Sequence, residues 1–411
     1  MASTKISRAF STATNAKKFT LSVWVKRCKL GSEQQIFSRS TGQAQLYINN
    51  AEKLQFYDQT SGHNFRTTRL FRDTSAWYHI VVAVDTTQST ASNRNKIYIN
   101  GVQETSFEVE TNATQNNDTA YNISGITYDI GAYNNAYYWD GYMSHFHFID
   151  GTMYTASPFG ETDASTGQWK INTSPSVTYG NNGFFILKDG NGVTDQSPNT
   201  NNWTASGNLT KSEDCPSNVF ATWNTLDNYY ASATLTNGNT KVATNSSAYS
   251  ATLTSLGASS GKYYAEFKLI NKGSGYCQIG IKGKQPTATS DGVGAGSDGL
   301  AYQLNGNKLL NGSSSSYGTS YDNNDIIGIA MDLDNNRLFF SKNGTFQDSG
   351  DPTSSTGAIT IPTSSSGFYF MGISDEHNNG TNTWEANFGN GYFGTTAVSS
   401  AGTNASNNGI F

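Results

Sequence analysis

The sequence predicts an all-β chain made of two antiparallel β-sandwich (jelly-roll) domains joined by a polar connector. Aromatic residues make up 13% of the 411 residues, while charged residues make up only 14%, against about 25% in an average domain. Short segments with a period of two recur along the chain, and the Leu, Ala, Glu and Lys that long helices need are scarce. At about 150 residues per domain, the length allows two or three domains.

The composition also limits the partners that we expect. With 26 basic and 31 acidic residues the net charge is −5, and no basic patch is interleaved with aromatic residues, so we expect no nucleic-acid partner. No run of about 18 apolar residues predicts membrane insertion. The N-terminus has no apolar signal core, so we expect no secretion. Cys28, Cys215 and Cys277 are too scattered for a disulfide framework or a zinc site, and we expect three free thiols.

The strands of the first domain are expected over residues 11–160, after an N-terminal arm over residues 1–10. One face of the first strand is apolar at every second position: Phe19, Leu21, Val23 and Val25. Trp77–Asp85 is apolar on both faces and rich in β-branched residues, which predicts a central strand. Asn95–Gln103 predicts a strand that enters an Asn-Gly hairpin turn. The last strand, Trp139–Asp150, places Phe146 and Phe148 on one face.

The strand pattern fades over residues 161–220, where Asn, Ser, Thr and Gly dominate. We interpret this segment as a connector, with the apolar run Gly183–Lys188 as a candidate strand added to the first domain. A second strand-rich block covers residues 221–411. Its clearest hairpin runs from Asp325 to Gly344, with a turn at Asn335-Asn336. Short strands at spacings of roughly 8–12 residues are typical of a sandwich.

These segments resemble two known modules. Residues 19–25, 77–85, 96–101 and 140–143 resemble the landmarks of a concanavalin A-like, laminin-G-type jelly roll. Residues 261–267, 325–333, 338–344 and 388–391 resemble a SPRY domain. The two-module arrangement, with its Asn/Ser/Thr/Gly-rich composition, is also similar to tail and fibre-associated proteins of marine bacteriophages, particularly those infecting cyanobacteria.

The phage resemblance implies a virion protein that is made in the bacterial cytoplasm without a signal peptide. We therefore expect it to lie on the virion surface, as an oligomer, with other virion proteins and a host-surface glycan or protein as partners. Because fold alone does not fix function, the residues themselves must indicate the chemistry.

Candidate catalytic groups are few, and we expect no enzyme activity. A glycosidase needs two carboxylates at a defined separation, but Glu108 and Glu110 lie in a polar, exposed segment. Asp332 and Asp334 flank a turn, where Asp commonly caps backbone groups. His145 and His147 share one strand face and could chelate a metal; the alternative is a polar outer face of a sheet.

Calcium is the one cofactor that the resemblance suggests. Laminin-G-like modules often bind it through Asp side chains and loop carbonyls, which suit a hard cation. Four aspartates lie at expected strand ends in the first domain and are the candidate ligands: Asp85, Asp129, Asp140 and Asp150. The alternative is that each caps a turn.

The most suggestive binding residues precede the last strand of the first domain. They are Tyr133, Asn135, Tyr137 and Trp139. Three consecutive aromatic residues cannot all face the core of a strand. If the phenylalanine face is the core face and no bulge intervenes, Tyr138 points inward, while Tyr137 and Trp139 point outward. Exposed aromatic faces can stack on sugar rings, and edge-strand packing or a subunit contact is the alternative.

The hypothesis is therefore host recognition by non-covalent binding, through loops that project from rigid sandwiches. A purely structural virion component, such as a head decoration or a tail-assembly piece, is the alternative. A polysaccharide depolymerase is disfavoured because the sequence lacks the paired carboxylate motif.

Overall fold

The computed structural model describes residues 3–188, 192–245, 248–273, 276–288, 291–375 and 380–411. It confirms the prediction of an all-β chain. The helical segments of these ranges are two 3₁₀ turns, η1 (Ala91–Asn93) and η2 (Ser157–Phe159). No helix in the described ranges is long and apolar enough to cross a membrane. The chain forms two compact units, residues 1–219 and 220–411.

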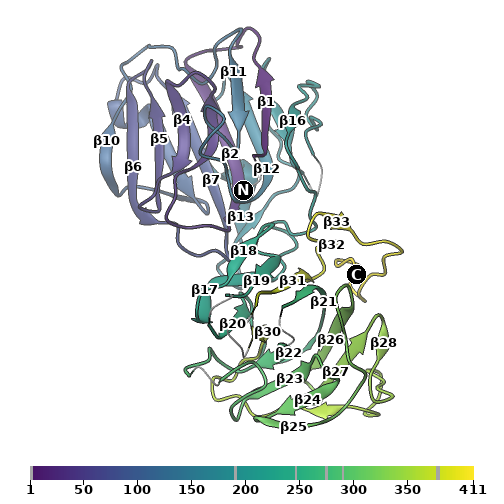
Figure 1. Ribbon diagram of the computed structural model, residues 1–411. Coiled ribbons are helices and arrows are strands. Elements are labelled where there is room, and N and C mark those ends of the chain that lie inside the picture. The colour runs from purple at the N-terminus through teal and green to yellow at the C-terminus, as the bar shows by residue number, and fades with distance from the viewer. Residues whose placement is uncertain (1–2, 189–191, 246–247, 274–275, 289–290, 376–379) are drawn as a thin grey trace. The chain divides into compact units, whose positions relative to one another are not determined.

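The first unit is a sandwich of two antiparallel sheets (Figure 1). The eight-stranded sheet has the order β10 (Phe107–Thr111), β6 (His63–Leu70), β5 (Lys53–Asp58), β4 (Ala44–Ile48), β3 (Gln34–Arg39), β11 (Thr127–Ile130), β1 (Lys5–Ala9), β16 (Thr204–Ser206). The six-stranded sheet has the order β15 (Phe184–Ile186), β12 (Gly141–Asp150), β2 (Lys18–Arg27), β7 (Trp77–Asp85), β8 (Asn95–Ile99), β9 (Val102–Gln103). A small separate hairpin joins β13 (Gly160–Thr162) to β14 (Trp169–Ile171).

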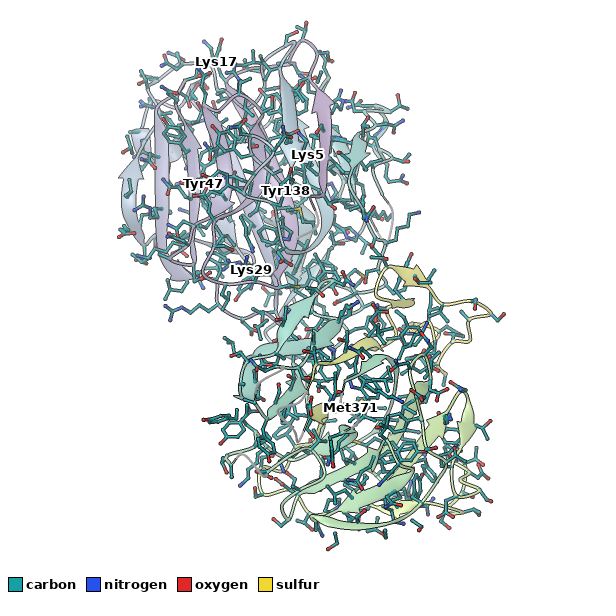
Figure 2. The ribbon with its side chains drawn as sticks, in the orientation of Figure 1. Lys5, Lys17, Lys29, Tyr47, Tyr138 and Met371 are labelled. Atoms are coloured by element: carbon teal, nitrogen blue, oxygen red, sulfur yellow. The ribbon has the colours of Figure 1, made fainter. Side chains whose placement is uncertain are left out.

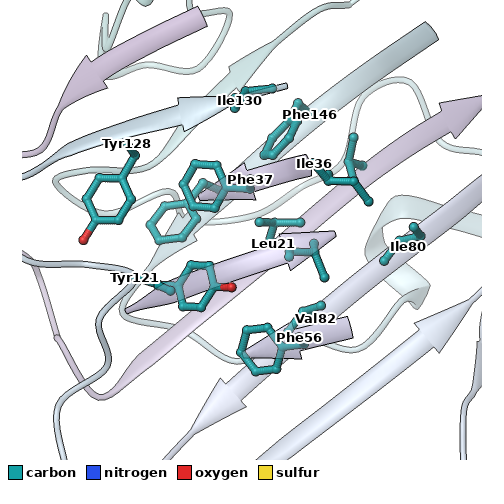
Figure 3. Packing of buried hydrophobic residues seen from close by; sticks show 14 of the residues in the cluster. Leu21, Ile36, Phe37, Phe56, Ile80, Val82, Tyr121, Tyr128, Ile130 and Phe146 are labelled. Carbon is teal, nitrogen blue, oxygen red and sulfur yellow. The ribbon is translucent and has the colours of Figure 1, made fainter. Parts of the chain in front are cut away.

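The core between these sheets is strongly aromatic (Figure 3). The Phe37 ring stacks on Tyr121 and Tyr128, with centroid separations of 5.8 and 5.6 Å. The alternation predicted for the first strand is confirmed, because its four apolar positions all lie in this core: Phe19, Leu21, Val23 and Val25.

The six-stranded sheet is buried on its outer face as well. Ile80, Val82 and Val84 of β7 face the core, whereas Val81 packs in a second cluster on the other side. That cluster is completed by residues 154–179, the covering segment, through these side chains: Tyr154, Ala156, Phe159, Trp169, Val177 and Tyr179. Double-sided burial explains why β7 is apolar on both faces, and it confirms the prediction of a central strand.

The N-terminal arm differs from the sequence-based expectation, whereas the added strand of the connector agrees with it. The arm predicted over residues 1–10 contains β1, which pairs with β11 and β16, and its Ile6 side chain lies in the core. The segment interpreted as a connector belongs to the first unit up to residue 219. Its candidate strand Gly183–Lys188 contains β15, which pairs with β12 as expected, whereas the three residues of β16 are too few to show a period.

The second unit is also built from two antiparallel sheets. One has the order β17 (Trp223–Tyr230), β20 (Ser250–Thr254), β30 (Phe370–Asp375), β22 (Cys277–Lys282), β23 (Gly299–Gln303), β24 (Asn307–Leu310), β25 (Ser313–Ser316). The other has the order β18 (Thr234–Thr236), β19 (Lys241–Ala243), β31 (Asn382–Asn387), β21 (Lys262–Lys272), β26 (Ile326–Asp332), β27 (Arg337–Lys342), β28 (Thr345–Phe346), with β29 (Ile359–Thr360) on β27. The short pair β32 (Tyr392–Phe393) and β33 (Thr396–Ala397) follows.

The second core confirms the predicted hairpin. Ile327, Ile329 and Met331 of β26 lie in it, and β26 pairs with β27 across the Asn335-Asn336 turn. All three cysteines are buried thiols and none of them forms a disulfide, which agrees with the three thiols expected from the sequence. Burial raises the pKa of the Cys28 and Cys277 thiols, which keeps both side chains neutral.

A buried ion pair ties the end of the first unit to its six-stranded sheet, and it should be needed for stability. Lys26 Nζ lies 2.9 Å from Asp214 Oδ2, and both side chains are almost inaccessible; the Trp77 indole donates to the other oxygen at 3.1 Å. We expect Asp214→Ala to lower the free energy of unfolding by about 3–5 kcal/mol, because it leaves a buried ammonium unpaired. Urea unfolding followed by tryptophan fluorescence measures this.

The double variant Lys26→Met/Asp214→Leu should recover most of that loss, since no buried charge remains. Asp322→Ala, which breaks the exposed pair with Lys272, is the matched control and should change little. If Asp214→Ala and Asp322→Ala lower the free energy of unfolding equally, the stabilising role assigned to the Lys26–Asp214 pair is contradicted.

His63 should make the first unit sensitive to acid. Its ring lies between Phe56 and Phe65, neither ring nitrogen has a hydrogen-bond partner, and burial lowers its pKa to about 3. Above the unfolded value of about 6.5 the residue is neutral in both states. Below it only the unfolded chain binds the proton. The free energy of unfolding therefore decreases by about 1.4 kcal/mol for each unit by which the pH is lowered.

We therefore expect His63→Leu to lose about 2 kcal/mol less stability than the wild type between pH 7 and pH 5. Urea unfolding at a series of pH values measures the two slopes. Identical slopes would show that His63 is protonated in the folded state or screened in the unfolded one.

Candidate functional site

The candidate binding residues lie in the loop between β11 and β12, which connects the eight-stranded sheet to the six-stranded sheet. Gly131 N donates to Ile36 O at 3.1 Å, and Gln35 N donates to Tyr137 O at 2.9 Å, so both ends of the excursion are held by β3. Between them Tyr133 and Ala136 exchange two backbone hydrogen bonds, of 3.0 and 2.8 Å. We call residues 133–137 the tyrosine hairpin.

Two tyrosine rings form the body of this hairpin. Tyr133 and Tyr137 stack at 6.2 Å between centroids with 24° between their planes, and 49% of Tyr137 is exposed. Asn134 and Asn135 form the turn with φ of +51° and are exposed; Asn tolerates this left-handed conformation better than most residues. The hairpin thus presents an aromatic surface with two amides beside it, on a backbone fixed at both ends.

The inward and outward assignments of the following residues are only partly right. Tyr137 is exposed, as expected, but Trp139 packs against the core and its buried Nε1 has no hydrogen-bond partner. Tyr138, labelled in Figure 2, is half-buried and is not a member of the core cluster. The condition of an unbroken strand fails, because β12 begins only at Gly141 and its pairing with β2 shifts register between Ser144 and His147.

Comparisons with known proteins identify both units. Residues 3–157 match the family model of the concanavalin A-like lectin/glucanases superfamily of the laminin G type. Residues 262–358 match the SPRY domain model. The chain carries a concanavalin A-like domain followed by a SPRY domain. This confirms the module order that the sequence landmarks suggested.

Solved structures with similar folds include isolated domains and parts of larger proteins. The SPRY domain of human HERC1 is 18% identical, with a TM-score of 0.31, and the match covers 40% of this chain and 96% of that one. A human SPRY domain is also 18% identical (TM-score 0.27; 36% and 90% covered). A Bacteroides ovatus protein named for carbohydrate binding is 18% identical (TM-score 0.33; 50% and 56% covered).

The four candidate calcium ligands of the concanavalin A-like domain do not form one site. Asp150 accepts N–H groups from Thr14, Asn15, Asn122 and Asn182 at 2.5–3.2 Å. Asp85 binds Thr87, Gln88 and Lys18. Asp129 binds Lys5 and Ser7 of β1. Asp140 is half-buried, and desolvation raises the pKa of its carboxyl group. Within the described ranges, no three His, Cys, Asp or Glu side chains are grouped to hold a metal.

Both histidines of the candidate pair are buried, and the His145 Nδ1 atom lies 2.8 Å from Ser144 Oγ. The expected polar outer face is covered instead, and His147 Nδ1 lies 2.9 Å from the Tyr179 hydroxyl of the covering segment. His79 beside it bonds Ser22 through Nε2 and accepts from the Trp169 indole at 3.0 Å. Burial lowers the pKa of both His79, to about 3, and His147, so both rings are neutral at neutral pH.

Three of the four carboxylates considered for catalysis have other partners. Glu108 lies 3.0 Å from Lys53 Nζ, on the exposed edge strand β10. Asp332 accepts from Asn335 N at 3.1 Å and Asp334 accepts from Gly261 N at 2.7 Å. Asp332 and Asp334 therefore cap turns, which is the alternative that the sequence offered.

The structure assigns opposite roles to two neighbouring aromatic residues. We expect Trp139→Ala to lower the free energy of unfolding by about 2–3 kcal/mol, somewhat less than a fully buried tryptophan would. Tyr137→Ala should change it by no more than about 0.5 kcal/mol, as exposed positions usually do. Urea unfolding distinguishes them, and the reverse order of the two losses would show that the loop packs differently.

Proposed function

We propose that this chain is a non-catalytic binding protein that recognises a glycan through the tyrosine hairpin of its concanavalin A-like domain. The observation that carries the proposal is the stacked Tyr133–Tyr137 pair, in which Tyr137 is exposed and Tyr133 is half-buried, on a turn whose backbone is held at both ends. Aromatic rings offer flat apolar faces to the C–H side of a sugar ring. The Asn134 and Asn135 amides beside them supply donors and acceptors for hydroxyl groups.

We further propose that the binding serves host attachment by a bacteriophage, with the chain as a tail or fibre component of the virion. The similarity of the two-module arrangement and of its Asn/Ser/Thr/Gly-rich composition to marine phage proteins supports this. Other virion proteins would then contact the chain, which would form an oligomer within the particle after synthesis in the bacterial cytoplasm. In the alternative, a purely structural component, the same exposed tyrosine would be covered by another virion protein.

Removal of the outer ring tests the proposal. We expect the full chain to bind a subset of spots on an array of bacterial surface polysaccharides, and Tyr137→Ala to weaken that binding about tenfold or more, a loss of roughly 1.4 kcal/mol. Tyr263→Ala in the SPRY domain is the matched control, because its exposed fraction of 47% is close to that of Tyr137. The control should bind like the wild type.

Three outcomes would contradict the proposal. Full binding by Tyr137→Ala would remove the hairpin from the site, and loss of virion assembly in the same variant would favour the structural role. Release of reducing ends from a bound polysaccharide would show an enzyme.

A further inference from the structure

The outer face of the eight-stranded sheet carries a second, larger set of hydrogen-bonding side chains. Its members alternate with the core positions of β4, β5 and β6 and are called the polar face: Gln45, Tyr47, Gln55, Tyr57, Asn64 and Arg66. None of them belongs to the core cluster, and all but Gln55 are partly exposed. Figure 2 marks Tyr47 on this sheet.

Strand register arranges rings and amides in alternation on the polar face. Tyr47 lies opposite Gln55, and Gln45 lies opposite Tyr57. The two rings therefore occupy diagonal positions on adjacent strands, where Cα atoms are about 7–8 Å apart. Each ring has amides as its nearest neighbours across the sheet, so stacking and hydrogen-bonding groups are interleaved over three strands.

Hydrogen bonds among these side chains fix them in place. Arg66 Nε donates to Gln55 Oε1 at 3.0 Å, and Gln55 Nε2 donates to Asn64 Oδ1 at 3.0 Å. On the other side of Tyr47, Gln35 Nε2 donates to Gln45 Oε1 at 3.0 Å. A partner would meet a preorganised surface, and would lose less side-chain entropy in binding to it.

The polar face carries little net charge. Lys53 Nζ and Arg66 Nη1 lie 3.0 and 3.7 Å from the same Glu108 carboxylate at its edge, and the other members are neutral. Such a surface offers a polyanion no cluster of cations. It also lacks the apolar anchors that form the centre of most protein interfaces.

The polar face is continuous with the tyrosine hairpin. Gln35 of β3 lies opposite Tyr47 and is fully buried. Its backbone N–H donates to Tyr137 O of the tyrosine hairpin. The Tyr133 hydroxyl lies close to Gly42 in the β3–β4 turn. A Cβ atom added to this glycine would be only 3.2 Å from the hydroxyl oxygen. The hairpin therefore borders the polar face on the β3 side.

We propose that the polar face binds an extended segment of an uncharged polysaccharide, which crosses β4, β5 and β6 and ends at the tyrosine hairpin. Tyr47 and Tyr57 are the stacking platforms, and Gln45 and Asn64 bind hydroxyl groups. The buried Gln55 holds Arg66 and Asn64 in place. This proposal rests on the proposed function and extends it, because the hairpin alone can hold one terminal sugar, whereas the polar face selects for chain length and for neutrality.

Affinity electrophoresis of the full chain tests this, in gels that contain a neutral β-glucan, a galactomannan or dextran, with dextran sulfate as the charged probe. We expect retardation by at least one neutral polymer and none by dextran sulfate. Tyr47→Ala and Tyr57→Ala should each raise the Kd for that polymer about tenfold, while Tyr47→Phe, which keeps the ring, should bind nearly as the wild type does. Tyr263→Ala is the control for loss of an exposed tyrosine.

The outcomes separate the two proposals. If Tyr137→Ala weakens retardation but both polar-face variants, verified as folded by urea unfolding, do not, the polar face is not the site and the proposed function stands. If the wild type binds the polysaccharide array but is retarded by no neutral polymer, the inference fails and the proposed function stands. Retardation by dextran sulfate alone, or a change of oligomeric state in Tyr47→Ala measured by light scattering, would assign the face to a polyanion or to a protein contact, and would overturn the inference.

Discussion

Buried backbone N–H groups need acceptors, and in the first unit a few buried aspartates meet that need. Long loops cross the ends of the sandwich without strand partners, so their N–H groups would otherwise be unsatisfied away from water. Asp58 accepts from Thr60, Ser61 and Ala120. Asp195 accepts from the backbone of Phe185, Ser197 and Asn201, and Asp150 accepts from three backbone N–H groups and from the side-chain amide of Asn122. These carboxylates fix the loops around residues 14–15, 60–61, 120–122, 182–185 and 197–201, which connect the strands of both sheets.

This framework explains which features the sequence could predict. Alternation within one strand decides which side chains share a face, so the core positions of β2 and the hairpin of β26 and β27 followed from the pattern. The partners of an aspartate at a strand end depend on loops that come from distant parts of the chain. The four aspartates were therefore candidates for one calcium site in the sequence, although Asp150 and Asp85 bind different loops and Asp129 binds side chains of β1.

The polar face and Trp139 show two further features that the alternation of residues along a strand could not predict. Gln45, Tyr47, Gln55 and Tyr57 were visible as the non-core positions of short strands, but the sequence does not say that three such strands pair with rings and amides in register. Trp139 precedes the strand rather than belonging to it, and the left-handed conformation of Tyr137 (φ +50°) breaks the alternation between them. The covering segment was missed because its apolar residues are scattered among polar ones.

The contacts of Asp150 also govern when the domain can be completed during synthesis. Its donors come from residues 14, 15, 122 and 182, and β1, near the N-terminus, pairs with β16 at residues 204–206. A nascent chain that ends at β12 therefore contains most strands of both sheets. It still lacks Asn182, whose backbone N–H binds Asp150, and β16, which pairs with β1. Contacts between such distant residues form late, so the first domain can close only after the chain has been made as far as β16.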